Sequence, residues 1–335
     1  MLKTFIIRSL CVCVLLICML ATAGISILLQ SKQSVFEKIT QKTESIVETS
    51  PFPVSVDPKT QTMTTVDLLG NHESETLAQQ SNSDQSNWKN AIVAFFSQKE
   101  WYQNLASPVG RIVVIWSGQR KEEVTQNIGD ILRWDTKQRK EFIELITQAE
   151  PVLAEGKFYP GEYVVHKGAT PKEVATLIEE KFNEDILFRY TDEVATQVPL
   201  EDALVIASLL EREASDFKNM REVSGVIWNR LFIDMPLQLD ATLQYVRGGK
   251  NNEKEWWPVP QSADKFLKSP FNTYANKGLP PSAIANPSAA AVLAALNPIA
   301  SECIYYFHAE DGSYHCSKTY EEHVTKLKAR YGRGS

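Results

Sequence analysis

Two glutamates stand close together in an apolar segment, residues 203–214, which reads "ALVIASLLEREA". At about 100° per residue, Glu211 and Glu213 project roughly 200° apart around a helix, so they cannot point into the same cleft. Both could be border residues that pair with neighbouring cations such as Arg212. Alternatively, one carboxyl is held among apolar groups, where its pKa rises and it can donate a proton near neutral pH. Cleavage of a glycosidic bond needs such a proton, because the leaving oxygen must be protonated as it departs.

Further polar residues follow in segments that could line a binding site. Asn229 and Arg230 end the next apolar helix, where they could bind a sugar or fix Glu211, or could equally cap the helix and form salt bridges. Gln238 and Asp240 alternate in a segment expected to be extended, so their side chains point the same way. Three more candidates for substrate contacts surround Pro270 in a loop: Ser269, Asn272 and Tyr274.

Other chemistries lack their signatures. The sequence contains no G-x-S-x-G motif and no glycine-rich phosphate loop. The chain beyond residue 30 carries a net charge of −8, which argues against nucleic acid as a partner. A β-hairpin is predicted over residues 304–316, where His308 would face His315. Their spacing is not that of a zinc site, so no metal and no other cofactor is predicted.

The cysteines fall into two groups. Three lie in the apolar N-terminal segment, and two, Cys303 and Cys316, flank the predicted hairpin. In the expected register Phe307 is opposite Cys316, and Tyr320 is opposite Cys303. The two sulfur atoms then do not face each other, so no disulfide is expected.

The N-terminal segment 9–29 contains no charge and follows Lys3 and Arg8. About 20 apolar residues span a bilayer, and the positive flank belongs in the cytoplasm. The rival interpretation is a signal peptide cleaved after Ala23. Because the apolar run continues past Ala23, we favour an uncleaved single-pass anchor in the cell membrane, with residues from about 32 onward extracytoplasmic.

Apolar periodicity and composition predict an α+β fold in four parts. Residues 1–31 form a cytoplasmic stub and the transmembrane anchor, and residues 32–87, rich in Ser, Thr, Gln and Glu, form a flexible linker. Residues 88–185 contain a helix and then the order strand, helix, helix, strand, helix. Residues 186–335 contain helices, proline-rich loops and the hairpin. The helix over 170–182 has a capping box, with Thr170 at the N-cap, Pro171 at N1 and Glu173 at N3.

Several motifs, in one order, resemble those of the MltG/YceG-like endolytic murein transglycosylases. They are "IASLLEREA", "VSGVIWNRL", "MPLQLDATLQY", "SPFNTYANKGLPPSAIANPS", "AALNP" and "SKTYEEH", preceded by "EGKFYPGEYVVHKGATPKEV". The resemblance covers roughly residues 108–330, and the family's anchor matches residues 9–29. Two departures are Ser288, where glycine is common, and Cys316, where an aromatic residue is common.

The resemblance implies a LysM-like subdomain before a mixed α+β catalytic domain. It also implies that Glu211 is the catalytic acid/base, while Glu213 orders the helix. One carboxyl suffices, because the muramic C6 hydroxyl of the substrate attacks C1 and leaves a 1,6-anhydro end.

The expected substrate is the nascent peptidoglycan glycan strand, cut between MurNAc and GlcNAc, with peptidoglycan synthases as further partners. Two alternatives remain open at this point: a non-catalytic peptidoglycan-binding scaffold and a hydrolase that uses water.

Overall fold

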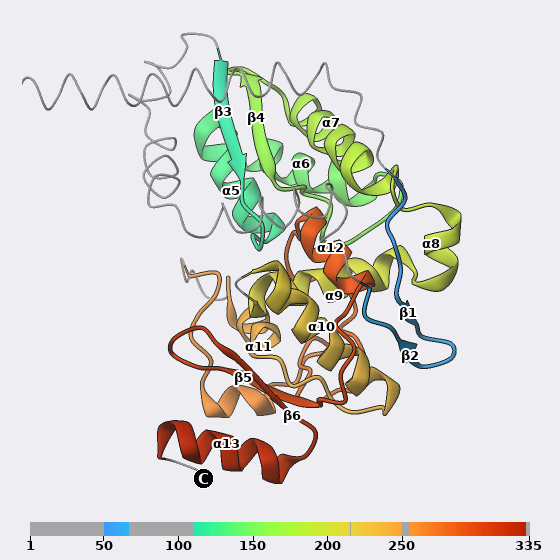
Figure 1. Cartoon of the computed structure of the whole chain (residues 1–335). Coiled ribbons are helices and arrows are strands. Elements are labelled where there is room, and N and C mark those ends of the chain that lie inside the picture. The colour runs from blue at the N-terminus through green and yellow to red at the C-terminus, as the bar shows by residue number, and fades with distance from the viewer. Residues whose placement is uncertain (1–49, 67–109, 215, 250–254, 333–335) are drawn as a thin grey trace, which may run out of the picture.

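The computed structural model describes residues 50–66, 110–214, 216–249 and 255–332. The fold is mixed α+β, with two-stranded antiparallel sheets set among helices (Figure 1). The apolar segment 9–29 and the helix expected after residue 88 lie outside the described residues. Within the described ranges, no helix is both long and apolar enough to cross a membrane.

The first helical unit follows the predicted order of elements. Strand β3 (Gly110–Ile115) pairs antiparallel with β4 (Gly161–His166), and α5 (Lys121–Leu132) and α6 (Thr136–Gln148) connect them. Helix α7 (Pro171–Phe182) follows and packs beside α6 (Figure 1). The predicted capping box of α7 is confirmed: Thr170 Oγ1 accepts from the Glu173 N–H at 3.3 Å, and Glu173 Oε2 accepts from the Thr170 N–H at 2.7 Å.

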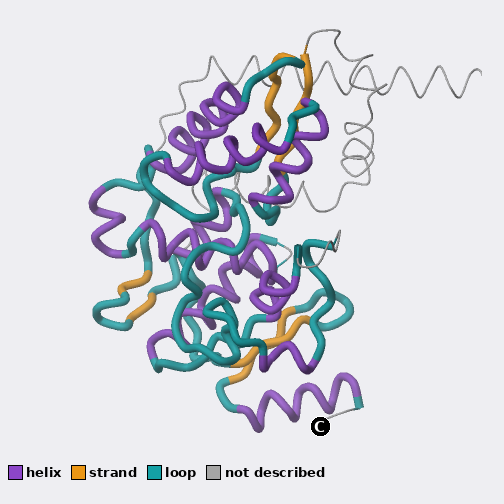
Figure 2. The backbone as a smooth tube through the Cα atoms, turned by 180° about the vertical axis from the view of Figure 1, so that it is seen from behind, coloured by secondary structure: helices purple, strands orange, loops and turns teal. Residues whose placement is uncertain are grey.

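The second unit is built around two buried helices. Helix α9 (Leu200–Glu213) buries eight consecutive residues, and every residue of α12 (Ala289–Leu296) is buried. The two pack against each other in the middle of the molecule, and α10 (Phe217–Phe232) covers both (Figures 1 and 2). The remaining elements of this unit are the π-helix η1 (Asn183–Leu187), α8 (Asp192–Gln197), α11 (Asp240–Arg247), the 3-10 helix η2 (Ser262–Phe266), β5 (Tyr305–His308), β6 (Tyr314–Ser317) and α13 (Tyr320–Tyr331).

Residues 50–66 are part of this second unit, so the prediction of a linker over the whole of 32–87 is wrong for them. They form strands β1 (Val56–Asp57) and β2 (Thr62–Met63), and the side chain of Phe52 is only 2% exposed. The Ser55 N–H donates to the Leu296 carbonyl at 3.0 Å, at the end of α12. A few apolar side chains fix this segment although its overall composition is polar.

The C-terminal hairpin forms, but its register is one residue from the expected one. Tyr306 is opposite Cys316, and Phe307 is opposite His315. The shift arises at the turn, where Gly312 takes a φ of 79° and donates its N–H to the Ala309 carbonyl. His308 is therefore opposite Tyr314 and does not face His315.

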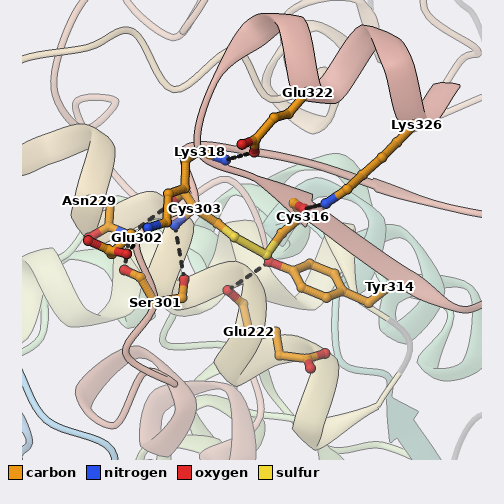
Figure 3. The surroundings of a disulfide bond; sticks show 10 residues. All are labelled: Glu222, Asn229, Ser301, Glu302, Cys303, Tyr314, Cys316, Lys318, Glu322 and Lys326. Atoms are coloured by element: carbon orange, nitrogen blue, oxygen red, sulfur yellow. Dashed lines mark hydrogen bonds and ion pairs between the residues drawn. A yellow bond between two sulfur atoms is a disulfide. The ribbon is translucent and has the colours of Figure 1, made fainter.

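The expectation that Cys303 and Cys316 remain unbridged is also wrong. They form a disulfide across the base of the hairpin, with their Cα atoms 5.7 Å apart (Figure 3). Cys316 is opposite Tyr306, and Cys303 lies before the first paired residue of β5, Tyr305. The Ile304 N–H donates to the Ser317 carbonyl at 3.0 Å, so the segment before β5 stays against β6, and its Cys303 lies within bridging distance of Cys316.

Candidate active site

Glu213 ends helix α9 and points its carboxyl into a cavity of about 400 Å³. Its Oε2 accepts a hydrogen bond from the Tyr306 hydroxyl at 3.1 Å, and its Oε1 lies 3.4 Å from the Ala241 N–H. Burial raises the pKa of this carboxyl above its usual value, although the two hydrogen bonds act in the opposite direction. The site therefore holds a carboxyl that keeps its proton to higher pH than an exposed glutamate does.

A second carboxylate shares this cavity. Asp240 opens helix α11, and its Oδ1 accepts from the Tyr274 hydroxyl at 2.7 Å. The negative charge of Asp240 contributes to the raised pKa of Glu213, because like charges disfavour ionisation. Burial and the bond to Asp240 raise the pKa of Tyr274, so its hydroxyl keeps its proton and remains a donor.

Arg230 supplies positive charge to the same cavity from helix α10. Its Nε donates to the Ile304 carbonyl at 2.7 Å, and its guanidinium also donates to the Leu237 carbonyl. These bonds hold the buried Arg230 guanidinium near Glu213 and restrict the movement of the Arg230 side chain. A fixed cation stabilises a carboxylate that forms when Glu213 releases its proton.

The predicted site residues divide into two sets. The cavity brings together Arg230, Gln238, Asp240, Tyr274 and Glu213. The four residues Glu211, Asn229, Ser269 and Asn272 are not among those that line it.

Glu211 lies on another side of α9. Its Oε2 accepts from the N–H and the hydroxyl of Ser288, at 3.0 and 2.9 Å. Ser288 is the N-cap of the buried helix α12, so these bonds join the ends of two core helices. The prediction that Glu211 and Glu213 face different surroundings is confirmed, but it is Glu213 that lines the cavity.

Three predicted substrate contacts instead support the backbone. The amide of Asn229 donates to the carbonyls of Ser301 and Cys303 at 2.7 and 2.9 Å, which fixes the base of the hairpin (Figure 3). Asn272 is fully buried, with its amide on two loop carbonyls, and Ser269 accepts from the Phe271 N–H at 3.2 Å.

The residues that the C-terminal elements contribute to the cavity were not predicted from the sequence. Tyr305 and Tyr306 of β5, with Tyr320 and His323 of α13, line the cavity. The dense run of aromatic residues in this hairpin was the available indication, because a hairpin that only pairs with itself needs no such run.

Comparison with known proteins assigns the chain to a family. The sequence model of the YceG-like family matches residues 71–329. The chain belongs to the YceG-like family. That range includes all the cavity-lining residues named above, from Glu213 to His323.

Relatives of this YceG-like chain include bacterial enzymes named endolytic murein transglycosylase. The one from Bacillus subtilis (strain 168) is 32% identical over 178 residues, which cover 53% of this chain and 48% of the relative. The one from Streptococcus pneumoniae (strain ATCC BAA-255 / R6) is 27% identical over 173 residues, covering 50% and 31%. The chain thus matches about half or less of the length of these relatives.

A solved structure supports the fold of the YceG-like chain. The 2.6 Å crystal structure of a yceG-like protein from Listeria monocytogenes superposes with a TM-score of 0.55 at 27% sequence identity. The match covers 65% of this chain and 76% of the Listeria chain. The mixed α+β arrangement is therefore shared with a protein of the same family.

Proposed function

We propose that this YceG-like chain is a lytic transglycosylase that cuts peptidoglycan glycan strands, with Glu213 as its general acid and base. The observation that carries the proposal is a carboxyl with a raised pKa in a cavity of about 400 Å³. Cavities of this size accept small-molecule groups such as sugar units. The names of the relatives support the reaction class and the peptidoglycan substrate.

The first step is a proton transfer. Protonated Glu213 donates to the glycosidic oxygen between MurNAc and GlcNAc, and the bond from that oxygen to muramic C1 breaks. The carboxylate that remains accepts from the Tyr306 hydroxyl and faces the charge of Arg230. These two groups stabilise the charged state through which the reaction passes.

The second step closes the muramic ring system. The C6 hydroxyl of the same sugar attacks C1, and the Glu213 carboxylate takes the proton from that hydroxyl. No water is consumed, the products are a 1,6-anhydroMurNAc end and a free GlcNAc 4-hydroxyl, and Glu213 regains its proton for another cycle. Glu211, held by Ser288, takes no part in this route.

A hydrolase is the second candidate, because Asp240 shares the cavity with Glu213. In that reaction Asp240 would activate a water molecule, and the product would carry a reducing end. A scaffold that binds glycan without cutting it is the third.

The proposal includes a place for the enzyme. Residues 9–29 anchor it in the cell membrane, and the catalytic unit lies on the extracytoplasmic side, where peptidoglycan synthases would be its neighbours. The disulfide between Cys303 and Cys316 supports an extracytoplasmic location, because disulfides persist in oxidising compartments and are rare in the cytosol.

The test uses the full chain in detergent on uncrosslinked glycan strands, with products read by mass spectrometry. The full chain is needed because residues 50–66 pack into the catalytic unit. Glu213→Gln should lower the rate by about 10² to 10⁴, the usual contribution of general acid catalysis. Glu211→Gln is the matched control, and it should keep activity because Gln can still accept from Ser288.

The outcomes separate the candidates. Anhydro ends from the wild type and from Glu211→Gln, with none from Glu213→Gln, support the proposal. Loss of activity only in Glu211→Gln would return the acid role to Glu211. Reducing ends would indicate the hydrolase with Asp240, and retained binding without any product would indicate the scaffold.

A further inference from the structure

The wall of the cavity away from α9 is aromatic. Tyr305 of β5 and Tyr320 and His323 of α13 line it, and Tyr306 of the same strand β5 donates its hydroxyl to Glu213. Their rings follow one another: Tyr320 lies 5.9 Å from Tyr305, and Tyr305 stacks on His323 at 5.5 Å with an angle of 28° between the planes.

Tyr320 is unusually exposed for a large aromatic residue, with 55% of its surface accessible. Helix α13, on which it lies, buries none of its residues and packs against the hairpin at the edge of the molecule (Figure 1). An exposed aromatic ring at the rim of a cavity is a common feature of ligand sites, whereas packing alone would favour burying it.

The three side chains themselves carry no charge at neutral pH, and the Arg230 guanidinium lies 5.6 Å from the centre of the Tyr305 ring. Burial, together with the nearby cations Arg230 and Lys326, lowers the pKa of His323, so the imidazole is neutral at neutral pH. The nearest cation on the connecting segment, Lys318, is paired with Glu302. The exposed, uncharged ring of Tyr320, which is tilted by 60° to that of Tyr305, suits the apolar C–H face of a pyranose ring better than it suits a charged peptide.

We infer that Tyr320, Tyr305 and His323 form a subsite for an uncharged N-acetylhexosamine unit of the glycan, beside the glycosidic bond that Glu213 protonates. This inference rests on the proposed function for the identity of the strand, but not for the binding itself. Tyr320 is the residue of this wall that ligand contacts would cover most, because it has the largest exposed area.

The test measures binding of N-acetylglucosamine oligomers, which are neutral, to the full chain carrying Glu213→Gln. In that background Tyr320→Ala should weaken binding about tenfold, and Tyr320→Phe should stay within about twofold because the ring remains. Tyr331→Ala is the matched control: Tyr331 lies on the same helix and its ring packs 6.2 Å from Phe307, but it does not line the cavity.

The inference is overturned if Tyr320→Ala binds as tightly as its parent, or if Tyr331→Ala loses as much affinity, since that would mean collapse of α13. A thermal melt of each variant identifies such a collapse. In the active chain, Tyr320→Ala should raise KM for glycan strands about tenfold with little change in kcat. If Tyr320→Ala weakens oligomer binding but the wild-type chain forms no anhydro ends, the subsite stands and the proposed function is refuted. If the wild-type chain forms anhydro ends but Tyr320→Ala does not weaken oligomer binding, the proposed function stands and the subsite is refuted.

Discussion

The disulfide between Cys303 and Cys316 should control how firmly the cavity wall is held. The bridge closes a loop of 13 residues that contains all of β5 and β6 up to Cys316. In the chain-entropy model, closing a loop of this length stabilises the folded state by about 3 kcal/mol. The double variant Cys303→Ser/Cys316→Ser should lose that contribution.

The loss should appear in the hairpin itself. Hydrogen exchange of the β5 and β6 amides should become faster by up to about 10²-fold, which is the equivalent of ~3 kcal/mol. Asn229 and Arg230 still bind the carbonyls at the start of the hairpin, so the segment should open locally while the core helices keep their protection.

Activity should follow the same change, because β5 carries Tyr306 to Glu213. The single variant Cys303→Ser is the control and should match the double variant, since either one removes the bridge. Variants are preferable to a reductant, which would also act on the three N-terminal cysteines. Unchanged exchange in β5 and β6 of the double variant would refute the claim that the bridge holds this wall.

Two further predictions concern titration. Tyr306→Phe removes a bond that lowers the pKa of Glu213, so the alkaline limit of kcat should move upward by about one pH unit, with Tyr305→Phe as the control that keeps the bond. An unmoved or lowered limit would mean that Glu213 is not the acid. Burial raises the pKa of Glu155 from 4.5, its value in the unfolded chain, to about 8 in the folded state. Between these two pH values the folded state keeps a proton that the unfolded state has released. Stability should therefore fall as pH rises from about 5 to 8, by up to a few kcal/mol, and Glu155→Gln should flatten that slope in denaturant titrations; a slope equal to that of the wild type would contradict it.

Local patterns in the sequence predicted the elements well. The capping box at Thr170 and the apolar spacing of 203–214 each led to the correct helix, because the interactions involved span only a few residues. The directions of Glu211 and Glu213 around that helix were also predictable from helical geometry.

The neighbours of these glutamates were not predictable in the same way. Glu211 meets Ser288, 77 residues away, and Glu213 meets Tyr306, 93 residues away. No local rule states which face of α9 receives which distant segment. The prediction of the hairpin register failed for a related reason: a shift of one residue at the turn changes the partner of every residue in the strand. The disulfide was missed because Cys303 lies before β5, where strand register does not fix its position.

The packing of residues 50–66 onto the second unit limits how far the cavity can lie from the membrane. With the anchor proposed for residues 9–29, only the twenty residues 30–49 separate its end from the first described residue, Ser50. Fully extended, that length of chain spans ~70 Å, and less in any other conformation. If the proposed function holds, the chain would then cut only glycan strands that lie close to the bilayer and would not reach the outer layers of the wall.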